Sequence, residues 1–189
     1  MSSVSVKAPL CFAVVVAISS TTAPSAAADP QQFPDLSGYT DINDNDYLTY
    51  SAYSTLGVQF VTPGGYRCRM SYISKAATSV IQCWGSLPGT AHNLVGVSYP
   101  SSAGDGAKFA DKDLSSMEQF QWMDGPGNWH DGTVSPDAYK PFPAHSKVTY
   151  ERETCGVDQS MTACVVAGGQ ANQGPSHGFV LSPNGSWTF

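Results

Sequence analysis

Charged side chains are scarce in this sequence, and basic ones are the scarcest. They make up 13% of the 189 residues, and 9 Lys and Arg stand against 15 Asp and Glu, for a net charge of −6. No stretch is rich in Lys or Arg, which argues against nucleic acid and anionic lipid as partners, because both bind clustered basic side chains. After residue 28 no apolar run approaches the 18 residues needed to cross a bilayer, so we expect no membrane span.

The first 28 residues have the order of parts typical of a secretory signal peptide. Lys7 supplies a positive start, residues 10–18 are apolar but too short to span a bilayer, and a run of alanines ends at Ala28. We expect Sec-type cleavage near Ala28 and a protein secreted to the extracellular medium or the cell envelope. Cys11 lies inside the apolar stretch and not after it, so we predict no lipid anchor.

Four cysteines remain after removal of the signal peptide, and an even number in an exported chain predicts disulfides. They form two close pairs: Cys68 with Cys83, and Cys155 with Cys164. Each pair brackets a segment with the pattern of a β-hairpin. If the first pair lies directly opposite, Met70 faces Ile81 on the cysteine side and Arg69 faces Gln82 on the other, so apolar groups gather on one face. We therefore predict these two local bridges over the other two connectivities.

The pattern of the chain favours β-structure over a helical bundle. Residues 66–72 alternate apolar and polar side chains, residues 148–167 form two β-rich runs around a turn, and Asn184-Gly185 is a strong hairpin signal. The predicted fold is mainly β: a small antiparallel β-sandwich or open barrel of hairpins with two local disulfides and one short helix. Residues 29–45 are predicted to form an extended N-terminal arm, and residues 46–189 a single disulfide-stapled β-domain.

The middle of the chain has a weaker pattern. Residues 101–113 are polar and predict a surface loop, and residues 115–118 have the spacing of a capping box, which predicts one or two helical turns up to Gly125. A strand through Phe120 and Trp122 is the alternative. Residues 124–145 contain four prolines and three glycines and are expected to be irregular.

Several motifs in this order resemble secreted proteins of mycobacteria and related actinobacteria. They are Phe-Pro-Asp-Leu-Ser-Gly-Tyr-Thr at 33–40, Phe-Val-Thr-Pro-Gly-Gly-Tyr-Arg-Cys at 60–68, a second cysteine near Trp84, the later cysteine pair, and His-Gly-Phe-Val-Leu-Ser at 177–182. The resemblance covers nearly the whole mature chain. It implies an exported compartment, the same cysteine pairing and a single domain. That family has no assigned activity, so the resemblance implies no function.

Residues 174–178 match the G-x-S-x-G pattern of serine hydrolases. That motif needs a strand before the serine and a helix after it. Here a polar loop precedes Ser176 and a strand is predicted after His177, so a turn is the favoured interpretation. His130 and Asp131 are the other residues that suit acid–base chemistry, and a hydrolase using these four side chains is the alternative function.

Metal-binding patterns are incomplete. Residues 41–46 begin like a calcium loop, but Asp46 stands where an EF-hand has glycine and Ala52 stands where it has glutamate. The four histidines show no spacing typical of a metal site. We therefore expect no metal site and no cofactor.

Aromatic side chains in the Gly/Pro-rich stretch are the best functional candidates. Trp122 and Trp129 flank Gly125-Pro126-Gly127, and His130 and Tyr139 follow, a set suited to stacking against a ligand. The alternative is that these rings cover the core. We expect a secreted non-enzymatic binding or interaction module of the bacterial envelope or extracellular medium, whose partner is an envelope component or a protein. The alternative is a secreted hydrolase acting on envelope polymers or peptides.

Overall fold

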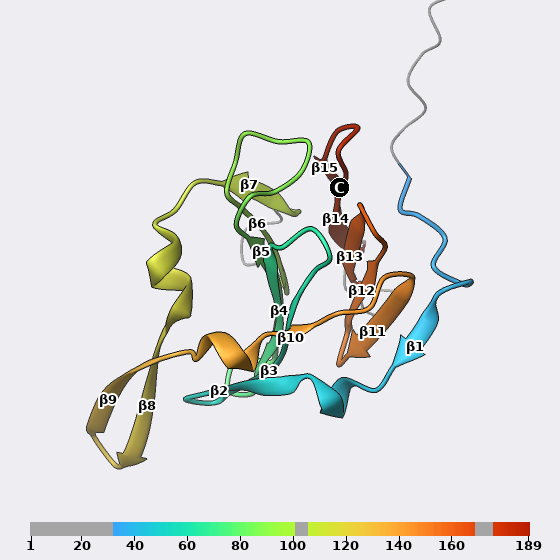
Figure 1. Cartoon of the computed structure of the whole chain (residues 1–189). Helices are drawn as coiled ribbons and strands as arrows, with labels where there is room; N and C mark the ends of the chain where they lie inside the picture. Colours follow the sequence, from blue (N-terminus) through green and yellow to red (C-terminus); the bar gives the residue numbers. More distant parts are fainter. Residues whose placement is uncertain (1–31, 101–105, 169–175) are drawn as a thin grey trace, which may run out of the picture. The chain divides into compact units, whose positions relative to one another are not determined.

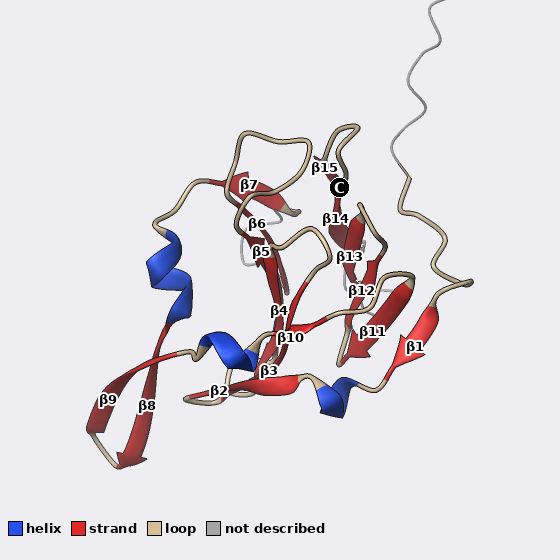
Figure 2. Cartoon of the chain, in the orientation of Figure 1, coloured by secondary structure: helices blue, strands red, loops and turns tan. Residues whose placement is uncertain are grey.

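The computed structural model describes residues 32–100, 106–168 and 176–189, which form two large β-sheets, one separate two-stranded sheet and short 3₁₀ helices (Figures 1 and 2). The mainly β fold is as predicted. The predicted signal peptide, residues 1–28, lies outside the described residues, as do residues 101–105 of the predicted surface loop and residues 174–175 of the G-x-S-x-G segment. No helix in the described ranges is long and apolar enough to cross a membrane.

The first sheet has six strands and contains the C-terminal part of the chain. Its spatial order is β1 (Thr40–Ile42), β11 (Ser146–Tyr150), β12 (Glu153–Val157), β13 (Thr162–Val166), β14 (His177–Leu181) and β15 (Trp187–Thr188). The strands are antiparallel except β1, which runs parallel to β11. Residues 29–45 therefore include a paired strand. β14 and β15 form the closing hairpin predicted around Asn184-Gly185.

The second sheet has seven strands and comes mainly from the N-terminal half. Its spatial order is β10 (Lys140–Pro141), β3 (Thr55–Val61), β4 (Arg67–Ile73), β5 (Thr78–Trp84), β6 (Leu94–Tyr99) and β7 (Lys108–Ala110), and β2 (Leu48–Ala52) also pairs with β3. β7 falls within the stretch predicted to be a surface loop. Residues 108–110 form a strand by pairing with β6, and nothing in their own sequence indicated this pairing.

Both predicted disulfides are present, and both cysteine pairs are directly opposed. Cys68 lies opposite Cys83 across β4 and β5, with Met70 opposite Ile81 as expected. The second bridge, Cys155–Cys164, joins β12 to β13. The assumption that the two cysteines lie opposite each other, together with the sorting of apolar side chains to one face, therefore predicted the register of the first hairpin correctly.

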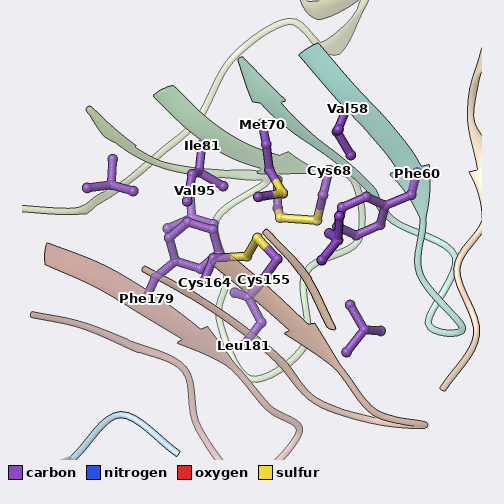
Figure 3. Packing of buried hydrophobic residues seen from close by; sticks show 14 of the residues in the cluster. Val58, Phe60, Cys68, Met70, Ile81, Val95, Cys155, Cys164, Phe179 and Leu181 are labelled. Carbon is purple, nitrogen blue, oxygen red and sulfur yellow. A yellow bond between two sulfur atoms is a disulfide. The ribbon is translucent and has the colours of Figure 1, made fainter. Parts of the chain in front are cut away.

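The main core lies between the inner faces of the two large sheets (Figure 3). Phe60 and Met70 from the second sheet pack with Phe179 and Leu181 from the first, and all four are fully buried. Both disulfides belong to the same core. Aromatic and sulfur-containing side chains thus fill a space that two sheets of short strands enclose.

A second, smaller core covers the outer face of the seven-stranded sheet. It contains Trp84, Leu94, Met117, Val134 and Tyr139. The elements that cover this face are η2 (Leu114–Glu118), η3 (Pro136–Ala138) and the start of β8 (Gln119–Gly125) at Phe120, and β8 pairs with β9 (Asn128–Thr133) in the separate two-stranded sheet. A third short helix, η1 (Asp44–Asp46), lies between β1 and β2, where the sequence begins like a calcium loop.

The expectation for the middle of the chain was partly wrong. The helical turn before residue 118 is present as η2, but the helix does not continue to Gly125, and β8 takes the strand alternative through Phe120 and Trp122. Residues 128–133, expected to be irregular, form β9. The reason is that Gly125-Pro126-Gly127 acts as a hairpin turn, with Gly127 at a φ of 81°, and so returns the chain along β8.

Candidate ligand-binding hairpin

The β8–β9 hairpin presents two exposed tryptophans. Trp122 lies opposite His130, and their rings stack with centroids 4.5 Å apart and planes 24° apart. Met123 lies opposite Trp129 on the other face. Trp122 is 42% exposed and Trp129 is 49% exposed. The alternation of a strand therefore gives each face of the hairpin one accessible indole ring.

A carboxylate fixes the imidazole beside Trp122. His130 Nε2 lies 2.9 Å from Asp124 Oδ2, and because an ionised carboxylate only accepts, Nε2–H is the donor. The Asn128 side-chain amide donates to the other oxygen of Asp124. The stacked Trp122–His130 pair is therefore bordered by an amide and a carboxylate that are available to polar groups of a ligand.

The second tryptophan is supported by the turn between β2 and β3. The Tyr53 ring meets Trp129 edge-on with centroids 4.7 Å apart, and the Tyr53 backbone N–H donates to the Gln121 carbonyl over 3.1 Å. Lys75 approaches the Tyr53 ring within 4.2 Å of its centroid. These contacts hold one side of the hairpin against the turn that follows β2, while both tryptophans stay partly exposed.

Glu118 anchors the base of the hairpin, because it is the last residue of η2 and directly precedes β8. Its Oε1 accepts from Arg67 Nη1 at 2.6 Å and from Trp84 Nε1 at 3.2 Å, and its Oε2 accepts from the Tyr139 hydroxyl at 2.6 Å. The Glu118 carbonyl accepts from the Val134 N–H, just after β9, at 2.8 Å. The bonds to the carboxylate are charge-assisted and about twice as strong as neutral ones. Together with the backbone bond, they fix the start of β8 and the end of β9 at the base of the hairpin.

Arg69 forms the floor of this anchor. It is 6% exposed, and its Nε donates to Gln59 Oε1 at 2.8 Å while its Nη2 donates to the Tyr139 hydroxyl at 2.7 Å. Its guanidinium lies 4.0 Å from the centroid of the Tyr50 ring and 5.0 Å from that of Trp84. Aromatic faces and neutral acceptors thus stabilise a buried cation that shares Glu118 with Arg67.

The predicted ligand residues fall into two groups. Trp122, Trp129 and His130 are together on the hairpin, whereas Tyr139 is 6% exposed and belongs to the Glu118 anchor. Burial is the main cause that raises the pKa of Tyr139, so it stays a neutral phenol that donates to Glu118 and accepts from Arg69. Sequence reasoning missed the anchor because its members are far apart in the chain and only strand pairing brings them together.

The four side chains considered for a hydrolase have other partners. Ser176 Oγ accepts from the Gly168 N–H, just outside the ends of β14 and β13, and His177 Nδ1 on β14 lies 3.3 Å from the Phe189 carbonyl oxygen. Asp131 accepts from the Gln121 amide on the hairpin. In the part of the chain that is described, no hydrogen bond joins any two of Ser176, His177, His130 and Asp131.

Neither metal-binding side chains nor similar proteins give a further indication of what this site binds. Across the described ranges, no group of three or more His, Cys, Asp or Glu side chains is arranged to hold a metal ion. Comparison with models of protein families, with curated proteins and with solved structures finds no match. Any indication of function therefore comes from the residues of this chain.

Proposed function

We propose that this protein is a secreted, non-enzymatic binding module of the bacterial envelope or extracellular medium, and that the β8–β9 hairpin is its ligand-binding element. The observation that carries the proposal is the exposure of Trp122 and Trp129 on an anchored hairpin. Tryptophan is enriched among the residues that dominate binding energy, because a large rigid ring gives much contact area at small entropic cost.

The exposed apolar side chains support this choice of surface. Within the described residues, the large hydrophobic side chains that are more than one-third exposed are Leu48, Leu56, Trp122 and Trp129. Two belong to the hairpin and two to β2 and β3, whose connecting turn contacts the hairpin through Tyr53. The two disulfides make the supporting sheets rigid, so the hairpin is displayed by a scaffold with little freedom to lose on binding.

The hydrolase alternative has less support. A serine hydrolase needs a base within hydrogen-bond reach of its nucleophile, and the described side-chain hydrogen bonds of Ser176 and His177 are with backbone groups, the Gly168 N–H and the Phe189 carbonyl. The His130–Asp124 pair has the geometry of an oriented imidazole, but it lies on an exposed hairpin, and among the described residues no hydrogen bond joins it to a serine, threonine or cysteine.

Cosedimentation with an insoluble bacterial cell-envelope fraction tests the proposal. We expect the wild-type protein to bind saturably and the double variant Trp122→Ala/Trp129→Ala to bind at least tenfold more weakly, since each truncated anchor costs more than about 1 kcal/mol. The control is Leu48→Ala/Leu56→Ala, which removes exposed apolar side chains of β2 and β3 and leaves the proposed binding element, the hairpin, intact. Equal losses in the two double variants would indicate nonspecific apolar adsorption and contradict the proposal.

A further inference from the structure

A pocket separate from the tryptophans lies beside the hairpin anchor. Its volume is about 420 Å³, and it is lined by Gly65, Arg67, Trp84, Gly85, Leu114, Ser115 and Glu118. Arg67 begins β4, Trp84 ends β5, and Leu114 begins η2, so the pocket opens where the outer face of the sheet meets that helix. Gly65 and Gly85 have φ values of 83° and 126°, and at these two positions backbone alone borders the opening.

The ionic groups at this pocket do not balance. Arg67 and Arg69 share one carboxylate, Glu118, at 2.6 Å and 3.9 Å, and the described residues give neither arginine another ionic partner. Tyr139, which also binds Glu118, stays neutral because burial raises its pKa. Within this group of three ionised side chains the positive charge exceeds the negative, and Arg67 is the member whose guanidinium lines the pocket, so an added anion would meet a cation that shares its counter-charge.

Arg67 has donors to spare for such an anion. Its side chain is 36% exposed, and one nitrogen, Nη1, binds Glu118. A guanidinium has five N–H donors in a planar fork that matches a carboxylate. Glu118 is 15% exposed, and its two oxygens already accept from three donors. Arg67 itself lines the pocket, and the described hydrogen bonds of its side chain use Nη1 alone.

The other walls select the kind of anion. Leu114 supplies an apolar wall, with Trp84 behind it, whereas Asp113 lies at the start of η2 with its carboxylate on the Ser115 N–H. An apolar wall beside the guanidinium favours an anion that carries an apolar group over inorganic phosphate, which has none. We infer that this pocket binds a monovalent carboxylate joined to an apolar group, with the carboxylate on Arg67 and the apolar group against Leu114. The inference does not depend on the proposed role of the hairpin.

Titrations followed by amide and arginine side-chain NMR shifts test this inference. The probes are hexanoate, its neutral analogue hexanamide, acetate and inorganic phosphate. We expect hexanoate to shift Gly65, Gly85, Ser115 and the Arg67 Nε–H signal, and to bind about tenfold more tightly than hexanamide or acetate. N-acetyl-glycyl-leucine distinguishes the two sources of this chemistry: tighter binding than hexanoate identifies a peptide C-terminus, and weaker binding a free aliphatic acid.

Variants assign the binding to Arg67. We expect Arg67→Gln to weaken hexanoate binding about tenfold, the loss of one hydrogen-bonded charge. Arg67→Lys, which keeps the charge beside Glu118 but loses the fork, should weaken it severalfold and serves if Arg67→Gln fails to fold. Lys147→Gln, which removes a cation on β11, is the matched control and should change the affinity less than twofold. Equal binding of hexanamide, equal binding of phosphate, or shifts centred elsewhere would each overturn the inference.

Discussion

Glu153 on β12 accepts a hydrogen bond of 2.7 Å from the backbone N–H of Val80 on β5, so a carboxyl of one sheet is tied to the backbone of the other. Glu153 is fully buried, and among the described residues its second oxygen has no hydrogen-bond partner. Burial raises the pKa of Glu153 to about 9, against the opposing effects of the Val80 N–H and the Ser79 hydroxyl. The folded protein therefore holds this carboxyl in its neutral form at neutral pH.

The first prediction is that Glu153 makes folding less favourable as pH rises. The unfolded state loses the proton from pH about 4.5 upward, while the folded state keeps it up to about 9. Between these values the contribution of Glu153 to the free energy of unfolding falls by about 1.4 kcal/mol per pH unit. Glu153→Gln, which is neutral and nearly isosteric, should be more stable than wild type at pH 7.5 and nearly equal to it at pH 4.

Urea unfolding at a series of pH values measures this difference. Glu151→Gln is the matched control, because it removes a carboxylate from the exposed turn two residues away. It should give a much smaller change with pH, because the charge of Glu151 is the smallest of the causes that act on the pKa of Glu153. A Glu153→Gln variant that is less stable than wild type at pH 7.5 would show that the buried carboxyl is ionised and stabilising, contrary to this prediction.

The second prediction concerns the anchor of the hairpin. Glu118→Gln keeps the shape of the side chain but leaves Arg67 and Arg69 without their shared counter-charge, so we expect a loss of about 2 kcal/mol in the free energy of unfolding. The loss is smaller than for a fully buried pair because Arg67 is partly exposed. Hydrogen exchange should accelerate most in the amides of β8 and β9.

Asp137→Asn is the control for this change. Asp137 is an exposed carboxylate in η3, close in sequence to Tyr139 but outside the Glu118 network. It should leave both the unfolding midpoint and hydrogen exchange of the hairpin unchanged. If Glu118→Gln behaved in the same way, the anchor would have no energetic role.

The third prediction concerns the disulfides. Replacing Cys68 and Cys83 together with alanine should lower the free energy of unfolding by about 3 kcal/mol, the value for a closed loop of 15 residues. The Cys155/Cys164 double variant should lose slightly less, because its loop has 9 residues. Denaturant midpoints check both values. A loss below about 1 kcal/mol for either pair would contradict this prediction, because it would show that the disulfide adds little to the stability that sheet packing already gives.

Local patterns predicted the parts of the fold in which neighbours in sequence are neighbours in space. The β4–β5 register followed from alternation around Cys68 and Cys83, and the closing hairpin from Asn184-Gly185. The parallel pairing of β1 with β11 was not predictable in this way, because it joins residues about 100 positions apart through backbone groups that every sequence has.

The candidate site shows the same division between features that are local in the sequence and features that join distant residues. The exposed tryptophans were recognisable because a Gly-Pro-Gly turn separates them. The anchor was not, because Arg67, Glu118 and Tyr139 come from three separate segments, and each alone resembles an ordinary surface residue. Tyr139 was grouped with the tryptophans for its proximity in sequence, yet its ring packs into the second core.

The last prediction separates a structural role of residues 176–178 from a catalytic one. A Cβ on Gly178 would lie 2.2 Å from the Cys164 carbonyl oxygen and 2.7 Å from the Phe189 ring, so the glycine is needed for close packing of β14. Gly178→Ala should therefore destabilise the fold by about 3 kcal/mol. Ser176→Ala removes one exposed hydrogen bond to Gly168 and should cost less than about 1 kcal/mol, with envelope binding unchanged. Near-UV circular dichroism checks folding of both variants. A folded Ser176→Ala protein that lost an esterase or peptidase activity present in the parent would instead establish the hydrolase alternative.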